Sequence, residues 1–221
     1  MPYGGAVPTI IPSYSGLQAG DTAPATLPIC TTTATSTSPV GPYPSSCSGA
    51  ADPNYTNITY IPGTVDVTAA TLTVTANNKT RPYGAANPVL DTTITGFLNG
   101  ETLGTSDVTG TPACSTTAVP SSTVFGSPYP ITCTIGTLAS NNYTFTFASG
   151  ELTVTPVTLT ITALDETKPY DKVAYSGGNG VSYSGFITGE DETTALSGSL
   201  TYSGSSQGAV DQAPTLSRLA A

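Results

Sequence analysis

Short stretches in which apolar and polar residues alternate are the main structural signal in this chain. The clearest lies at residues 72–76, where Leu72, Val74 and Ala76 are separated by threonines. Alternation with a period of two predicts a β-strand with one buried face. We expect further strands at residues 89–97, 111–117, 129–135, 143–147 and 151–155. Residues 101–108 follow an Asn-Gly break and begin with an acid, so we expect one or two helical turns there.

The sequence also repeats itself. Pro-Tyr-Gly occurs at residues 2–4 and again at 82–84, an offset of 80 residues, and the glycine predicts a turn that other residues do not adopt. Gly-Leu-Gln-Ala-Gly-Asp-Thr at 16–22 matches Gly-Phe-Leu-Asn-Gly-Glu-Thr at 96–102 in the same register. Such a period corresponds to whole small domains. We define copy one as residues 1–69, copy two as 70–156 and the looser, partial copy three as 157–211.

Both ends of the chain depart from the repeat. Copy one has no counterpart of the first strand of copy two, because only Met1 precedes Pro2. We therefore expect the chain to be a fragment of a longer array, with an open sheet edge in copy one. Residues 212–221 show no alternation and no counterpart. One added nucleotide in a suitable choice of codons restores a strand-like phrase there, so we expect a frame shift, with a divergent tail as the alternative.

Composition narrows the class of protein. Charged residues make up only 9% of the 221 residues, and the net charge is −9. An acidic surface repels phosphate backbones, so nucleic acid is not an expected partner. No stretch approaches the roughly 18 apolar residues that a membrane-spanning helix needs. Disorder is the alternative for so much Thr, Ser, Gly and Pro, but the alternating runs favour a folded β protein.

Several motifs of copy two together resemble the MBG domain (YGX type) of bacterial surface proteins. They are Leu72–Asn78, Pro82–Gly84, Gly96–Gly100, Asn142–Thr146 and Gly150–Thr155. Copy three resembles the related YDG domain through Lys168–Asp171, Ala174–Gly178 and Val181–Phe186, although Lys172 replaces the family's glycine. The resemblance implies tandem β modules in secreted, adhesin-like proteins, with adjacent modules as partners. It implies no catalytic residue and no cofactor, and it identifies no ligand.

Four cysteines occupy equivalent places in copies one and two, and their spacings are 17 and 19 residues. They are Cys30, Cys47, Cys114 and Cys133. Each interval holds a Thr/Ser-rich turn between two strand-like runs, and facing positions on antiparallel strands are close enough for a disulfide. We predict the pairs Cys30–Cys47 and Cys114–Cys133, which favour an oxidising compartment. A metal site is less expected because the chain has no histidine, and free buried thiols remain an alternative.

Acidic groups are the remaining candidates for chemistry. Histidine-dependent catalytic triads are excluded, and paired carboxylates of a glycosidase type exist only at Asp165–Glu166 and residues 190–192. The second group recurs as Glu101 and Asp21 at the expected helical turn, which favours capping over catalysis. Asp165, Glu166 and Asp171 are a possible calcium cluster, with a solvated acidic turn as the alternative. The recurring tyrosines Tyr55, Tyr83 and Tyr143 are expected to pack in the core or at corners.

Together these features predict a mainly β chain of tandem modules, each a small Ig-like β-sandwich or a β-grasp-like unit with at most one short helix. The expected role is a structural stalk of a secreted or surface-anchored bacterial protein. The linkers support a stalk because only Ala69–Ala70 and Pro156–Val157 separate the flanking strand-like runs. The alternative is a binding module whose loops or open edge engage a glycan or protein. An enzyme is not expected.

Overall fold

The computed structural model describes residues 1–169, 171–173 and 180–201. The rest of the chain lies outside the described residues: Tyr170, the whole of the second YDG-like motif at 174–178, the end of copy three and the tail at 212–221. The frame-shift hypothesis concerns that tail and therefore also falls outside the described residues. The chain divides into two compact units. Unit 1 comprises residues 1–79, 88–117 and 128–152, and unit 2 comprises 80–87, 118–127 and 153–221.

The described residues form strands and one short helix, which confirms the mainly β fold class. The elements are β1 (Ile29–Thr32), β2 (Gly41–Ser48), β3 (Gly63–Val67), β4 (Ala70–Ala76), β5 (Lys79–Pro82), β6 (Thr92–Thr95), β7 (Ala113–Thr116), β8 (Tyr129–Thr134), β9 (Tyr143–Ala148), β10 (Gly150–Thr155), β11 (Thr160–Ala163), β12 (Val181–Ser184) and α1 (Glu192–Ala195). No helix in this described part is long and apolar enough to cross a membrane.

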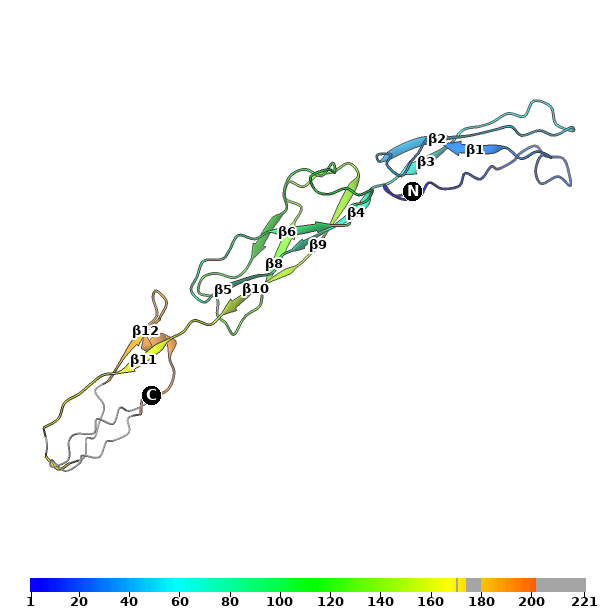
Figure 1. Ribbon diagram of the computed structural model, residues 1–221. Helices are drawn as coiled ribbons and strands as arrows, with labels where there is room; N and C mark the ends of the chain where they lie inside the picture. The colour runs from blue at the N-terminus through cyan, green and yellow to red at the C-terminus, as the bar shows by residue number, and fades with distance from the viewer. Residues whose placement is uncertain (170, 174–179, 202–221) are drawn as a thin grey trace. The chain divides into compact units, whose positions relative to one another are not determined.

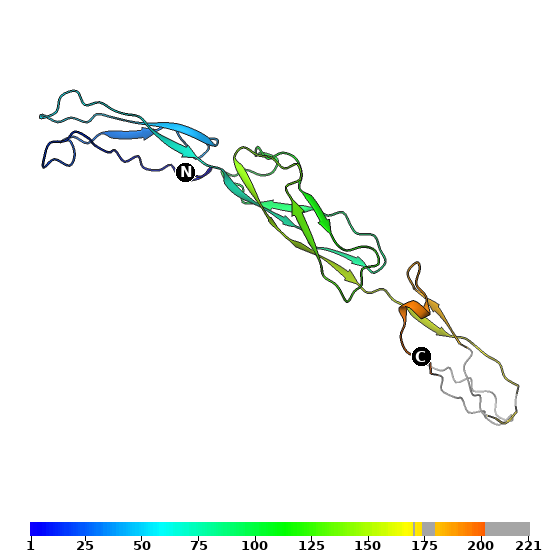
Figure 2. The same ribbon diagram turned by 180° about the vertical axis from the view of Figure 1, so that it is seen from behind.

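The sheet β6-β4-β9 has the alternating strand of copy two at its centre. β4 runs antiparallel to β6, with Val74 opposite Ile94, and parallel to β9, with Leu72 opposite Phe145. Figures 1 and 2 show β4 and β9 side by side in both views. A central strand has its backbone groups paired on both edges, so β4 organises this sheet.

Alternation along β4 sorts its side chains as predicted. Leu72 and Val74 are fully buried, whereas Thr71 and Thr73 lie on the exposed face. The hydroxyls of these threonines lie 3.3 and 3.4 Å from those of Thr144 and Thr146 on β9. Such cross-strand threonine pairs stabilise a solvent-facing sheet surface. The high threonine content therefore has a structural use in the strands.

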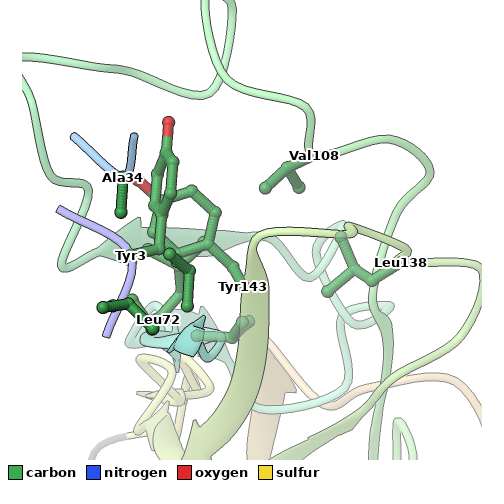
Figure 3. Close-up of a cluster of buried hydrophobic side chains, with 10 residues drawn as sticks. Tyr3, Ala34, Leu72, Val108, Leu138 and Tyr143 are labelled. Carbon is green, nitrogen blue, oxygen red and sulfur yellow. The ribbon is translucent and has the colours of Figure 1, made fainter. Parts of the chain in front are cut away.

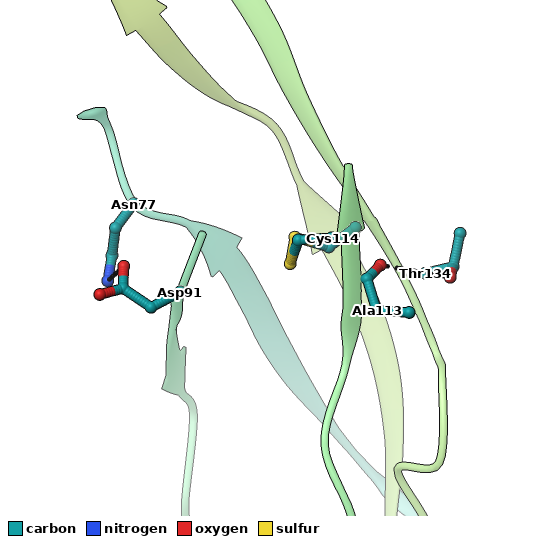
Figure 4. Close-up of a disulfide and its surroundings, with 6 residues drawn as sticks. Asn77, Asp91, Ala113, Cys114 and Thr134 are labelled. Atoms are coloured by element: carbon teal, nitrogen blue, oxygen red, sulfur yellow. Dashed lines mark hydrogen bonds between the residues drawn. A yellow bond between two sulfur atoms is a disulfide. The ribbon is translucent and has the colours of Figure 1, made fainter. Parts of the chain in front are cut away.

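The second sheet of copy two has the strand order β5-β10-β8-β7. Ile131 on β8 and Leu152 on β10 are fully buried, so this sheet supplies the other large core side chains. β7 and β8 are antiparallel and place Cys114 directly opposite Cys133. Figure 4 shows the Cys114 disulfide beside the hydrogen bond that Thr134 donates to the carbonyl of Ala113.

Copy one forms only the sheet β1-β2-β3 within the described residues. These strands correspond to β7, β8 and β10, and the register again places two cysteines opposite each other, Cys30 and Cys47. Met1–Tyr3 lies where the end of β5 lies in copy two, because Tyr3 N donates to Thr68 O as Tyr83 N donates to Thr155 O. The segments that correspond to β6 and β9 are not strands.

In unit 2, β11 and β12 repeat the pairing of β4 with β6. Ile161 lies opposite Tyr183, as Val74 lies opposite Ile94. α1 begins after Asp191, whose carboxylate accepts from the backbone of Thr193 and Thr194, so the expected capping role is confirmed at this residue. Hydrogen bonds from the side-chain hydroxyls of Thr193 and Thr194, followed by the bond from the backbone N–H of Thr194, lower the pKa of Asp191.

Two local predictions for copy two were wrong. Residues 101–108 contain turns and no helix. The backbone N–H of Ser106 donates to the carbonyl of Thr102, but no further backbone bond of the α-helical type follows it. The strand expected at 89–97 is shorter and forms only β6 (Thr92–Thr95), and β5 (Lys79–Pro82), just before the predicted Pro-Tyr-Gly turn, was not predicted. Gly84 has a φ of +80°, as expected for a position that other residues avoid.

Candidate functional site at the repeat junctions

In unit 1, one carboxylate joins copy one to copy two. The hydroxyl of Tyr3, from the first Pro-Tyr-Gly phrase, donates to Oε1 of Glu101 at 2.6 Å. The hydroxyl of Tyr143, from copy two itself, donates to Oε2 of the same carboxylate at 2.6 Å and accepts from the backbone N–H of Leu98 at 3.0 Å. Both carboxylate oxygens of Glu101 are therefore used within the protein.

The rings of these tyrosines belong to the hydrophobic core of unit 1. Tyr3 and Tyr143 are only 4% and 3% exposed. Their rings pack edge to face with centroids 5.4 Å apart, and Phe97 packs against Tyr143 in the same way at 5.8 Å. Figure 3 shows the two tyrosines together with Leu72 and, nearby, Ala34 of copy one. Aromatic packing and hydrogen bonding thus act on the same side chains.

Burial and the neighbouring carboxylate also change the acidity of the tyrosines. Burial, followed by the hydrogen bond to Glu101, raises the pKa of Tyr143 to about 12. The hydrogen bond to Glu101, followed by burial, raises the pKa of Tyr3. In each case the neutral hydroxyl is favoured because the phenolate cannot donate to Glu101 and would be repelled by it.

The glycine of the first Pro-Tyr-Gly phrase is required by the same junction. Gly4 has a φ of +73°, and a Cβ on it would lie 2.6 Å from the Cβ of Leu98. A side chain at this position would meet both a strained backbone and a direct clash. Two hydrogen bonds lie beside this contact: the backbone N–H of Gly4 and the side-chain amide of Asn99 both donate to the carbonyl oxygen of Ser36.

The same arrangement occurs a second time, between copy two and copy three within unit 2. Tyr83 of the second Pro-Tyr-Gly phrase donates from its hydroxyl to Oε1 of Glu190. A Cβ on Gly84 would lie 2.5 Å from Cγ2 of Ile187. Ile187 and Glu190 correspond to Leu98 and Glu101. The hydrogen bond, followed by burial, raises the pKa of Tyr83. A tyrosine–glutamate bond and a glycine–aliphatic contact therefore recur at both junctions.

The predicted cysteine pairs are close in the structure. Cys30–Cys47 and Cys114–Cys133 are both disulfides, and each joins two adjacent antiparallel strands with Cα atoms 4.0 Å apart. No other cysteine exists in the chain. The disulfides lie within copies one and two and not between them, so they stabilise single sheets.

The acidic candidates do not assemble into a metal site. Within residues 1–169, 171–173 and 180–201, no three Asp, Glu or Cys side chains lie together in a way that would hold a metal ion. Asp171 accepts from Lys168 at 2.8 Å, and this bond, ahead of the backbone N–H of Val173, lowers its pKa. Its carboxylate is thus used in a local ion pair.

A shallow hollow in unit 1 is the best candidate for a ligand pocket among the described residues. It measures about 540 Å³ and is bordered by apolar side chains that include Ile94, Phe97 and Leu103, with the acids Asp91 and Glu101 at its rim. Glu101 is bonded to two tyrosines, and Asp91 accepts from Lys79 and Asn77 at 2.8 Å each. The Lys79 bond is the main cause of the lowered pKa of Asp91. The charged groups of the hollow are thus already paired.

Comparison with known protein families finds the same repeat as the internal alignment of copies one and two. Residues 1–66 and residues 72–153 each match the family described as MBG domain (YGX type). The chain belongs to the MBG domain family. No curated protein and no solved structure matches it. The matches cover copies one and two, so each half of the unit 1 junction comes from an MBG domain.

The residues that join the MBG copies were not recognised as a site from the sequence. The recurring tyrosines were assigned to the core, which is correct for Tyr143, and the recurring acids were assigned to helix capping, which is wrong for Glu101. A signal was present. Every Pro-Tyr-Gly phrase is followed, in the next copy, by a Gly-aromatic-aliphatic phrase that ends in Gly-Glu. The two phrases that contact each other lie in neighbouring copies, so the sequence of one MBG copy alone does not indicate the contact.

The tyrosine pKa values predict a loss of stability at alkaline pH. A free tyrosine ionises near pH 10, so between about pH 10 and 12 the unfolded chain loses a proton that folded Tyr143 retains. The raised pKa of Tyr3 acts in the same direction. The free energy of unfolding should be flat with respect to these groups below pH 10 and should fall as the pH rises to 12. Urea titrations from pH 8 to 12 measure it, and Tyr143→Phe should make the fall shallower.

Tyr60→Phe is the matched control for this titration. The hydroxyl of Tyr60 contacts the backbone of Ala50 and no carboxylate. Tyr60→Phe thus deletes a tyrosine hydroxyl without removing a tyrosine–carboxylate bond, so a shallower fall in Tyr143→Phe alone would assign the effect to the bond with Glu101. If the free energy of unfolding falls equally steeply with pH in the wild type and in Tyr143→Phe, the contact with Glu101 does not raise the pKa of Tyr143 in solution.

Proposed function

We propose that copies one, two and three are successive modules of a structural stalk in a secreted or surface-anchored bacterial protein of the adhesin type. The observation that carries the proposal is the repeated junction: Tyr3 with Glu101 in unit 1 and Tyr83 with Glu190 in unit 2. A spacer needs the same defined contact wherever one module follows another. Copy three enters this proposal as a YDG-like module, on its motifs and on the pairing of β11 with β12.

Other features support a spacer outside the cell. Two disulfides are typical of proteins that fold in an oxidising compartment. Residues 68–69 alone separate β3 from β4 and residues 156–159 separate β10 from β11, so the linkers leave little freedom between copies, and Pro156 restricts the second linker. Membership of the MBG domain family fits a repeat module of a surface protein.

The test is a binding screen of the purified chain on arrays of glycans and extracellular matrix proteins. A stalk predicts no saturable binding to any array member. The contrary result is a single ligand with a dissociation constant below about 100 μM, which corresponds to a binding free energy beyond roughly −5 kcal/mol. A ligand of that affinity would favour a binding module, and the hollow beside Phe97 would be the first place to mutate.

A further inference from the structure

One turn of unit 1 consists of an asparagine followed by a glycine. Asn99 and Gly100 are its two central residues, and the N–H of Glu101 closes it by donating to the carbonyl of Leu98 at 2.9 Å. Both central residues have a positive φ, +53° and +74°, as in the type I′ turn for which Asn-Gly is a preferred sequence. We call this pair of residues the junction turn.

The junction turn lies between the two residues of copy two that meet the first Pro-Tyr-Gly phrase. Leu98, just before the turn, is the side chain that a Cβ on Gly4 would strike. Glu101, just after it, accepts from the hydroxyl of Tyr3 at 2.6 Å. A change in the backbone of the junction turn therefore acts directly on the contact between copies one and two.

Both residues of the junction turn are open to water. Each is exposed, and the N–H of Gly100 donates no hydrogen bond within the part of the chain that the structure describes. Nothing lies within 4 Å of the place where a Cβ on Gly100 would be. Neither a side chain nor a neighbouring segment thus shields the Gly100 nitrogen, which follows the side-chain amide of Asn99 directly in the chain.

We propose that Asn99 is a site of spontaneous deamidation and that this modification loosens copy one from copy two. The nitrogen of Gly100 loses its proton to a base in solution and attacks Cγ of Asn99. The N–Cγ bond forms, the Cγ–Nδ2 bond breaks, and the departing nitrogen takes up a proton and leaves as ammonia. Water then opens the succinimide ring at either carbonyl and gives aspartate or isoaspartate. The reaction as a whole consumes water and releases ammonia, so it needs no enzyme and no oxidant.

Each product removes a feature on which the junction depends. The side-chain amide of Asn99 donates to the carbonyl oxygen of Ser36 at 3.2 Å. The carboxylate of aspartate has no proton to donate at neutral pH, so two acceptors would face each other there. Isoaspartate also adds a carbon to the main chain between Leu98 and Glu101. The lengthened turn no longer holds these two residues at the spacing at which they meet copy one.

The equivalent turns of copies one and three lack the reactive pair. Ala19 and Thr188 occupy the position of Asn99, and each is followed by a glycine with a positive φ. Both turns are closed by the same type of backbone bond, at 3.1 Å. The repeat therefore forms this turn without asparagine, and Asn99→Thr is a matched variant that carries the residue of copy three.

The test keeps the intact chain in mildly alkaline buffer for several weeks and maps its peptides by mass spectrometry. All chains carry Asn179→Gln, which removes the other Asn-Gly pair of the sequence. We expect aspartate and isoaspartate to accumulate at Asn99. In the modified chains the amide of Gly4, which donates to Ser36 at 3.0 Å, should exchange about tenfold faster, as expected for one lost hydrogen bond. Fresh Asn99→Asp should show the same faster exchange, whereas aged Asn99→Thr should exchange as it did when fresh.

A synthetic peptide of residues 95–104 provides the reference for the chemistry. If Asn99 converts in this peptide but keeps its amide in the folded chain, the fold blocks the reaction and the proposed site is wrong. If Asn99 converts in the chain but Gly4 exchanges at the same rate in aged and fresh samples, the modification does not loosen the junction. That result would overturn the second half of the proposal and leave deamidation without a structural consequence.

Discussion

Glu101→Ala is expected to lower the free energy of unfolding of unit 1 by about 3 kcal/mol. The substitution removes two charge-assisted hydrogen bonds at 2.6 Å and leaves the hydroxyls of Tyr3 and Tyr143 without their acceptor. Both tyrosines are almost completely buried, so water does not simply replace the carboxylate. Because Tyr3 belongs to copy one, the loss should appear both as lower stability and as greater independence of copy one from copy two.

The measurement combines urea unfolding with backbone ¹⁵N relaxation. Wild-type relaxation should give one rotational correlation time for the strands of copies one and two, and Glu101→Ala should give two. Glu151→Ala is the control, because it removes the same charge from an exposed position on β10. A double-mutant cycle of Glu101→Ala with Tyr3→Phe should show a coupling of more than about 1 kcal/mol. A stability loss no larger than that of Glu151→Ala would contradict the role given to the junction.

Sequence reasoning recovered five strands of copy two, made β6 too long and missed β5; the recovered strands are β4, β7, β8, β9 and β10. β4 and β10 were predicted within two residues at each end, because Leu72, Val74, Leu152 and Val154 mark one buried face. β5 was missed since Lys79–Pro82 contains no apolar alternation and owes its strand conformation to pairing with distant residues. Its one buried side chain is Arg81, which satisfies its donors on Asn87 and on loop carbonyls. Such long-range pairing leaves no local signal.

The junction residues illustrate a different limit. Tyr3 and Glu101 are 98 positions apart, and each recurs in a pattern that has an ordinary local explanation. An acid after a glycine resembles a helix cap, but the cap of α1 is Asp191, one position after Glu190. Glu190 is the counterpart of Glu101, and both accept from the tyrosine of a Pro-Tyr-Gly phrase. The junction acid and the helix cap are thus adjacent positions of the repeat, and only their spatial neighbours distinguish them.

Removal of the Cys30–Cys47 disulfide should have a larger structural effect than removal of Cys114–Cys133. The closed loops have nearly equal sequence separations, 17 and 19 residues, so the chain-entropy model assigns each bridge about 3 kcal/mol. The surrounding sheets differ. Cys114–Cys133 lies in a four-stranded sheet of a copy that also has the sheet β6-β4-β9, whereas Cys30–Cys47 lies in the three-stranded sheet of copy one.

Intact mass spectrometry first establishes that each bridge forms in solution, because reduction adds two hydrogens for every disulfide. The comparison then uses Cys30→Ala with Cys47→Ala against Cys114→Ala with Cys133→Ala, and hydrogen exchange reports on β2 and β8. In the variant without Cys30–Cys47, we expect the backbone amides of β2 to lose their protection from exchange. At the same temperature, the amides of β8 should remain protected in the variant without Cys114–Cys133. A sheet that lacks a partner sheet has a small core, and a loss of about 3 kcal/mol is then most of its stability. If β8 loses protection as readily as β2, the size of the sheet around each disulfide does not determine how much that disulfide stabilises it.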